Sequence, residues 1–244
     1  MIFALNRSLI LSALVLLVVA ICVGLLSFGY AETPHDLLGW SSKIALLISG
    51  IIVLLGIRPI LRALHFITFA KYWWFPWLDG EWRAEIRSNW PKVQRMYLAA
   101  KGESLKFDAL AAPLTDADEL VTMASVTIQS SLFEISIEIA PDGTNKVSRT
   151  RFVQPRWARP DRPELSYVYA QLDNAVLAPT DTRQHYGAGI VEYIERTGEL
   201  SGHYWTNRKA QAALNTAETI TMRRVAKPSL LARLRHQISL KGLD

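Results

Sequence analysis

The first 76 residues are dominated by two apolar runs. Leu9 to Phe28 carries no charged residue over about twenty positions, and a helix of that length, rising about 1.5 Å per residue, spans the roughly 30 Å hydrocarbon layer of a bilayer. The second run, Ile44 to Ile57, extends back to residue 37 when the Lys43 amine reaches the membrane interface. A cleavable signal peptide fits less well, because the first run is too long and a second run follows it. The pattern predicts two transmembrane helices, about residues 9–28 and 37–57.

From residue 77 onward the hydrophobic period becomes two, which is typical of strands. The clearest example is Ile135 to Ile139, where isoleucines alternate with Ser136 and Glu138. We place eight strands at residues 79–90, 119–130, 132–140, 146–154, 164–175, 185–196, 198–208 and 216–225. Eight antiparallel strands with no amphipathic helix between them predict an up-and-down β-barrel, and a β-sandwich is the main alternative. Residues 99–118 are an insertion, with one helical turn expected, that this topology does not place.

Two further segments connect the barrel to the membrane. Residues 61–70 are expected to form a helix near the lipid headgroups, beside the aromatic sequence KYWWFPW, and a linker helix packed on the barrel is the alternative. Residues 226–244 place leucine and isoleucine between basic residues at helical spacings, so we expect an amphipathic tail attracted to anionic lipid. The chain is thus divided into a membrane part (1–76), a barrel (77–225) and a basic tail (226–244).

The charge distribution sets the topology and disfavours nucleic acid as a partner. The net charge of +5 comes from the two ends, and the barrel between them carries slightly more acidic than basic residues, so we expect no DNA or RNA binding. Arg7 precedes the first apolar run, and Arg58 and Arg62 follow the second. The loop between the runs has no lysine or arginine. The positive-inside rule therefore places both termini and the barrel in the cytoplasm.

Sequence signatures of catalysis are absent. The chain contains no H-E-x-x-H, C-x-x-C, G-x-S-x-G or Walker motif, and its single cysteine, Cys22, excludes an internal disulfide or a thiolate metal cluster. The five histidines are scattered along the chain; His203 is expected on the surface, and His185 is the better candidate for contacting a ligand. We therefore expect no enzymatic activity, no metal and no cofactor.

The seventh strand predicts the location of a binding site. In LSGHYWTNRKAQ, which begins at Leu200, the residues Tyr204, Thr206 and Arg208 share one face, and Trp205 and Asn207 share the other. A guanidinium on the inward face requires a partner, either a ligand or a carboxylate. If odd strands run away from the membrane, Arg208 ends at the membrane-distal rim, together with Trp90, Asp173, Lys146, Ser148 and His185. The alternative is that Tyr204 belongs to the core and Arg208 pairs with Asp173.

The order of these parts resembles a known family. Two N-terminal apolar helices, LDGEWRAEIRSN (78–89), SVTIQSSLFEISIEI (125–139), HYGAGIVEYI (185–194) and LSGHYWTNR (200–208) look like the two-transmembrane, β-strand-rich effectors of cyclic-oligonucleotide antiphage signalling (CBASS). The resemblance covers nearly the whole chain. It implies an eight-stranded barrel that binds a cyclic dinucleotide made by a neighbouring nucleotidyltransferase. Binding would promote self-assembly of the helices and disruption of the bacterial inner membrane.

A cyclic dinucleotide offers two phosphates and two bases, which call for arginine, hydroxyl groups and aromatic rings. The Tyr-x-Thr-x-Arg pattern of the seventh strand is carried over from the family to Tyr204, Thr206 and Arg208. The expected ligand-binding residues are Tyr204, Thr206, Arg208, Ser148, Tyr169, Trp90 and His185. Two other functions remain open: a membrane-anchored carrier of an apolar or lipid-like ligand, which predicts an apolar rim, and a membrane-anchored hydrolase.

Overall fold

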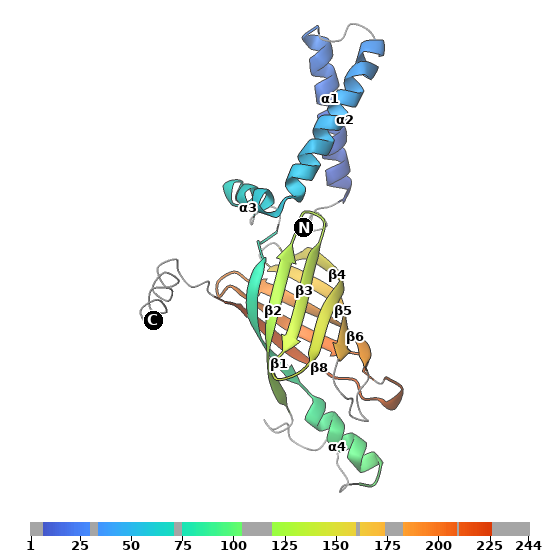
Figure 1. Cartoon of the computed structure of the whole chain (residues 1–244), viewed down its shortest axis with the longest axis vertical. Coiled ribbons are helices and arrows are strands. Elements are labelled where there is room, and N and C mark those ends of the chain that lie inside the picture. Colours follow the sequence, from blue (N-terminus) through green and yellow to red (C-terminus); the bar gives the residue numbers. More distant parts are fainter. Residues whose placement is uncertain are drawn as a thin grey trace, which may run out of the picture.

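The computed structural model describes residues 7–29, 34–70, 75–103, 119–159, 162–173, 183–208 and 210–225. Eight antiparallel strands pair in sequence order, and β1 also pairs with β8, which closes the barrel (Figure 1). The prediction of an up-and-down barrel is therefore confirmed, and the sandwich alternative is wrong. The strands are β1 (Gly80–Ser88), β2 (Leu120–Ser130), β3 (Ile135–Pro141), β4 (Lys146–Arg159), β5 (Arg162–Asp173), β6 (Gln184–Ile194), β7 (Glu199–Thr206) and β8 (Ala217–Arg224).

The first strand ends earlier than the sequence pattern predicted. β1 stops at Ser88, and Trp90 begins a helix, α4 (Trp90–Ala100), so the expected absence of a helix between strands was wrong. Pro91 explains the difference, because proline cannot donate to a strand ladder and its fixed φ suits the first turn of a helix. Helix α4 extends to Ala100, into the predicted insertion. Residues 104–118, which make up most of the 99–118 insertion where a helical turn was expected, lie outside the described part of the chain.

The fourth strand is longer than expected. It continues past residue 154 to Arg159 in a hairpin with β5, and the pairing shifts between Thr150 and Phe152. Such an irregularity changes which residues face inward, since side chains alternate along a strand. Ser148 accordingly lies inside the barrel, and beyond the shift Val153 and Pro155 are the buried positions. The tail at 226–244 and the end of the predicted fifth strand, at 174–175, also lie outside the described residues.

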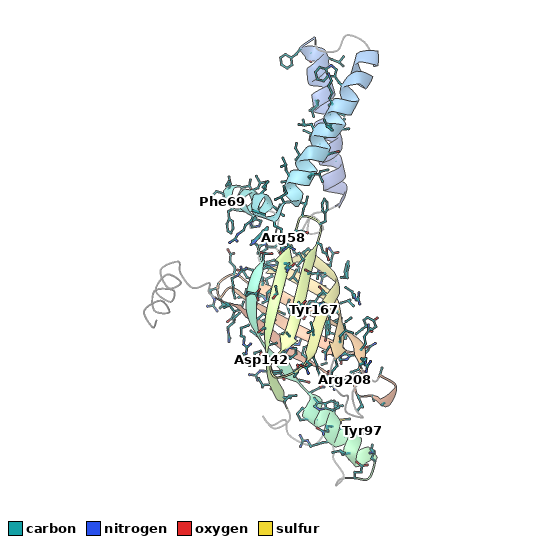
Figure 2. The ribbon with its side chains drawn as sticks, viewed as in Figure 1. Arg58, Phe69, Tyr97, Asp142, Tyr167 and Arg208 are labelled. Atoms are coloured by element: carbon teal, nitrogen blue, oxygen red, sulfur yellow. The ribbon has the colours of Figure 1, made fainter. Side chains whose placement is uncertain are left out.

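Three helices precede the barrel: α1 (Arg7–Ser27), α2 (Pro34–Gly56) and α3 (Arg58–Ile67). Of the helices in the described ranges, none on its own has the length and apolar character needed to cross a bilayer. Taken together, the segments Lys43–Gly56 and Arg58–Ile67 have that length and character, but they are bent by 91° with respect to each other. Helix α3 begins three residues earlier than predicted, with Pro59 in its first turn. Figures 1 and 2 show these helices at one end of the barrel and Arg208 near the other.

The barrel end next to the helices is filled by apolar side chains. Leu61 of α3 is buried in one cluster with Phe75, Leu78 and Trp82, as expected of a linker helix packed on the barrel. Trp82 Nε1 donates to the Leu78 carbonyl at 2.9 Å, and the Arg224 guanidinium lies 4.6 Å from the centre of the Trp82 ring. Because this end is packed with large side chains, a small ligand can enter the barrel only from the opposite end.

Candidate functional site

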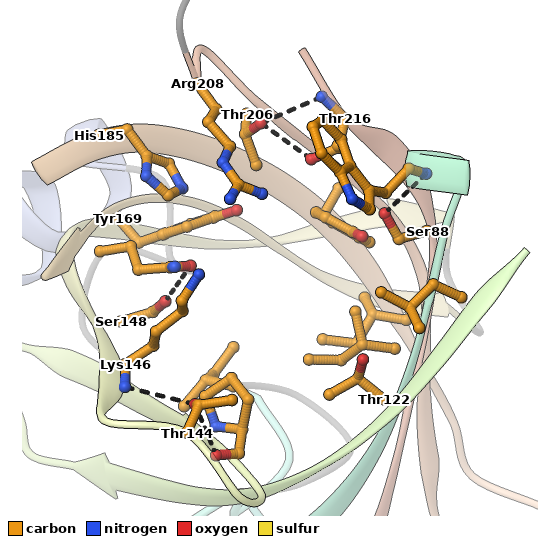
Figure 3. Close-up of a pocket in the computed structure, with 18 of the residues that line it drawn as sticks. Ser88, Thr122, Thr144, Lys146, Ser148, Tyr169, His185, Thr206, Arg208 and Thr216 are labelled. Carbon is orange, nitrogen blue, oxygen red and sulfur yellow. Dashed lines mark hydrogen bonds between the residues drawn. The ribbon is translucent and has the colours of Figure 1, made fainter. Parts of the chain in front are cut away.

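A cavity of about 310 Å³ lies inside the barrel at the end away from the helices. All seven residues predicted to bind a ligand line it, which confirms that they gather in one place: Tyr204, Thr206, Arg208, Ser148, Tyr169, Trp90 and His185. Figure 3 shows Arg208, His185, Tyr169, Ser148 and Lys146 around the same space. Its volume is within the range of small-molecule sites, roughly 300 to 1,000 Å³.

Side chains along β7 alternate between the interior and the surface of the barrel, as the sequence predicted. Tyr204 and Thr206 are buried, and Trp205 and Asn207 are exposed. The Tyr204 hydroxyl donates to the Arg87 carbonyl of β1 at 3.0 Å, and Thr206 Oγ1 lies 3.0 Å from Thr216 Oγ1. Thr206 Oγ1 also accepts from the Thr216 backbone N–H at 3.2 Å. Both hydroxyls therefore help to hold neighbouring strands together, in addition to any contact with a ligand.

Arg208 follows the end of β7 and stacks on an aromatic ring. Its guanidinium carbon lies 4.9 Å from the centre of the Trp90 ring. Trp90 is held at the start of α4, where its backbone N–H donates to Ser88 Oγ at 3.3 Å. Stacking on an indole face favours a guanidinium over an ammonium and limits its rotation. The cation is thus oriented at the mouth of the cavity.

A second cation, Lys146, lies on the opposite side of the mouth. Its Nζ is 3.3 Å from Oδ2 of Asp173, which is the carboxylate that the alternative interpretation assigned to Arg208. Among the described residues that line the cavity, the charged side chains are Lys146 and Arg208, and none is a carboxylate. Two cations therefore line the cavity, and the Asp173 carboxylate offsets the charge of one of them.

A polar row crosses three neighbouring strands below the mouth. Gln171 of β5 is paired with Ser148 of β4 on one side and with His185 of β6 on the other. Ser148 Oγ donates to Gln171 Oε1 at 3.3 Å, and His185 is buried. Gln171 also lines the cavity and was not among the residues predicted to bind a ligand. Cross-strand register, which a single sequence does not give, is what identifies it.

Two tyrosines form the floor of the cavity. Tyr167 and Tyr169 of β5 lie opposite Gly189 and Gly187 of β6, and their ring centres are 6.1 Å apart. Burial raises the pKa of both phenols, and it also raises the pKa of Tyr204 despite a hydrogen bond with Ser88 that lowers it. The floor is therefore electrically neutral at physiological pH and offers O–H groups.

The glycines opposite the tyrosines provide the space that the rings occupy. A Cβ at Gly189 would lie 2.5 Å from Cζ and from the hydroxyl oxygen of Tyr167. At Gly187 it would meet both the Tyr169 ring and the backbone carbonyl of Trp205. These contacts are too short for carbon atoms, so the floor depends on glycine at both positions.

We therefore expect Gly189→Ala to displace the Tyr167 ring and to lower the free energy of unfolding by at least about 1 kcal/mol, as overpacking usually does. Urea denaturation followed by tryptophan fluorescence measures the loss. The same substitution in a Tyr167→Ala background should cost less, because the ring that it meets is gone. Equal costs in the two backgrounds would show that the ring and the glycine are not coupled.

Other features of the cavity were not predicted. Thr122, Thr144 and Thr216 add hydroxyl groups to its wall, and Ile86, Ile139 and Ile220 add apolar surface. In the ranges that the structure describes, no three His, Cys, Asp or Glu side chains are grouped so as to hold a metal ion. The arrangement combines cations at the mouth, hydroxyls and an amide in the wall, and neutral aromatic rings at the floor.

No protein-family model matches the sequence, and a search of curated proteins finds no match to it.

Proposed function

We propose that the chain is a membrane-anchored sensor and effector whose barrel binds a cyclic dinucleotide in the cavity at its open end. The observation that carries this proposal is the Arg208 guanidinium stacked on Trp90, in a cavity that also contains Lys146 and several hydroxyl groups. A guanidinium matches two phosphate oxygens at once, and its flat face also accepts a base. Phosphate and base are the two chemical parts of such a ligand.

The shape of the site favours a discrete ligand over a polymer. Leu61, Phe75, Leu78 and Trp82 fill the opposite end of the barrel, so a nucleic acid strand cannot pass through it. A compact ligand with anionic groups at one side and aromatic rings at the other fits the cations at the mouth and the tyrosines at the floor. A cyclic dinucleotide has this composition.

The proposal gives the helices a role in the bacterial inner membrane. Both α1 and α2 carry exposed apolar side chains, among them Leu16, Val23, Leu46 and Val53. In this scheme the two helices cross the bilayer, with both termini and the barrel in the cytoplasm, and α3 rests at the headgroups through its exposed Phe66 and Ile67. Exposed apolar side chains of this kind are stable against lipid or against other copies of the same helices.

The effector role follows the CBASS resemblance. A neighbouring nucleotidyltransferase supplies the cyclic dinucleotide during phage infection, ligand-bound barrels associate, and the tethered helices assemble and disrupt the inner membrane. The barrel performs no chemical reaction in this scheme, and the infected cell dies before the phage matures. Support comes from the order of the parts along the chain and from the composition of the cavity.

Calorimetric titration of the full-length protein in detergent tests the ligand class. The probes are cyclic di-AMP, cyclic di-GMP, cyclic di-UMP and palmitate. We expect at least one cyclic dinucleotide to bind with saturation at one per barrel, with an affinity that falls as salt rises, because salt screens the phosphate contacts. Binding of palmitate alone would support the apolar-ligand carrier, and binding of none of the four would refute the proposal.

A further inference from the structure

We infer that the nucleobase of the ligand enters the barrel as far as the tyrosine floor, where the Tyr167 hydroxyl hydrogen-bonds to the edge of the base. The inference rests on the proposed function and adds an orientation: the phosphates stay at Arg208 and Lys146, and one base points inward. In this orientation Tyr167, which was not among the predicted ligand-binding residues, recognises the identity of the base.

The Tyr167 side chain is 2% exposed, and its hydroxyl has no hydrogen-bond partner among the residues that the structure describes. Tyr167 is one of the residues that line the cavity, and Figure 2 labels it in the middle part of the barrel. Buried hydroxyl groups are nearly always hydrogen-bonded, because an unmade bond leaves the desolvation of the group without compensation. A buried O–H that lacks a protein partner, on a residue that lines a cavity, is therefore a candidate contact for a ligand.

The nearby hydroxyl of Tyr204, in contrast, is already engaged within the fold. Tyr204 donates its proton to the Arg87 carbonyl and keeps lone pairs that can accept. Tyr167 retains its proton, since burial raises the pKa of its phenol and the nearby Tyr204 adds to this. The floor thus presents one free donor close to one acceptor, and the edge of a base carries acceptors and donors side by side.

The depth of Tyr167 fits this orientation. Along the inward face of β5 the residues pass from Leu165 and Tyr167 through Gln171 to Asp173, from the closed end of the barrel to the mouth. Tyr167 and Asp173 are six residues apart in the strand, which is about 20 Å of rise at roughly 3.3 Å per residue, and Lys146 pairs with Asp173. Arg208, Lys146 and Tyr167 all line the same cavity, so a ligand that fills it extends from the cations toward the floor.

Tyr167→Phe isolates the hydroxyl, because the phenylalanine ring can still occupy the space opposite Gly189. Calorimetry on the full-length protein in detergent, with cyclic di-AMP, cyclic di-GMP and cyclic di-UMP, should show about tenfold or greater weakening for the ligand that binds best. The variant should also show a smaller preference among the three ligands than the wild-type protein does. A buried donor discriminates between ligands because a ligand that leaves it unpaired loses binding free energy. Tyr193→Phe on β6, whose side chain is not among those lining the cavity, is the control and should leave all three affinities unchanged.

Thermal unfolding in the absence of ligand separates ligand recognition from a structural role. The melting temperature of Tyr167→Phe should equal or exceed that of the wild type, because the substitution removes a hydroxyl that has no partner in the fold. A melting temperature several degrees lower, or unchanged affinity and preference, would overturn the inference while the proposed function stands. If the wild-type protein binds none of the three cyclic dinucleotides, the proposed function and this inference fail together.

Discussion

Arg208→Ala should weaken binding of the cyclic dinucleotide by a factor of about 10 to 100, which corresponds to the roughly 1.5 to 3 kcal/mol of a hydrogen bond to a charged group. The guanidinium lies 4.9 Å from the Trp90 ring, so it is already oriented when the ligand arrives and little side-chain entropy is lost on binding. Titration calorimetry of the full-length protein measures the change. Unchanged affinity would remove Arg208 from the site.

Arg208→Lys distinguishes the shape of the cation from its charge. Lysine keeps the positive charge and loses both the planar fork and much of the stacking on Trp90, so we expect clear weakening, though less than with alanine. Arg149→Ala is the matched control, because Arg149 is an exposed arginine on the outer face of β4 and pairs with Glu138 at 2.7 Å. An equal effect of Arg149→Ala would show that general electrostatic attraction, and not the cavity, determines the affinity.

Side-chain alternation explains why the site could be assembled from the sequence. Each strand of a barrel has one face toward solvent and one toward the interior. Tyr204 and Thr206 could therefore be placed inside, and Trp205 outside, before any contact was known. Strand direction then brought residues from β4, β5, β6 and β7 to one rim. Trp90 lies at the predicted rim even though it begins a helix, because the first helical residue after β1 is close to the end of the strand.

Strand register and the signals for the start of a helix explain why α4, the Tyr167–Gly189 pair and the role of Gln171 were not predicted. Asn89 followed by Pro91 is a recognisable helix start, but the alternation of Ser88 and Trp90 continued the strand pattern across it. Tyr167 and Gly189 are matched only when β5 and β6 are paired in the correct register. Such pairing depends on residues far apart in the chain, which no local pattern in one sequence records. The same limit applies to Gln171, whose two neighbours come from different strands.

The position of the cavity constrains how a ligand signal reaches the membrane. The cavity and the helices lie at opposite ends of the barrel, and the core between them is closely packed, so a ligand does not push on the helices directly (Figure 1). A ligand shifts an equilibrium only through a difference in its affinity for the two states. We therefore expect the ligand to favour contacts between barrels. In the proposed scheme the helices are confined to one membrane, and such contacts raise their local concentration.

Replacing Gly24 and Gly50 with leucine should abolish ligand-dependent membrane leakage and leave ligand binding intact. A Cβ at either glycine meets no atom within 4 Å in the single chain, so the larger side chains fit the monomer and obstruct only close approach between copies.

Val23→Leu with Val53→Leu is the control, since it adds little bulk at exposed positions of the same two helices. Dye uptake by cells that produce the ligand measures leakage, and light scattering of the full-length protein in detergent measures assembly. Arg208→Ala, in contrast, should weaken binding and reduce leakage at the same ligand concentration. If the size of the full-length protein is the same with and without saturating ligand, association of barrels is not the switch, and the ligand must act within a single chain.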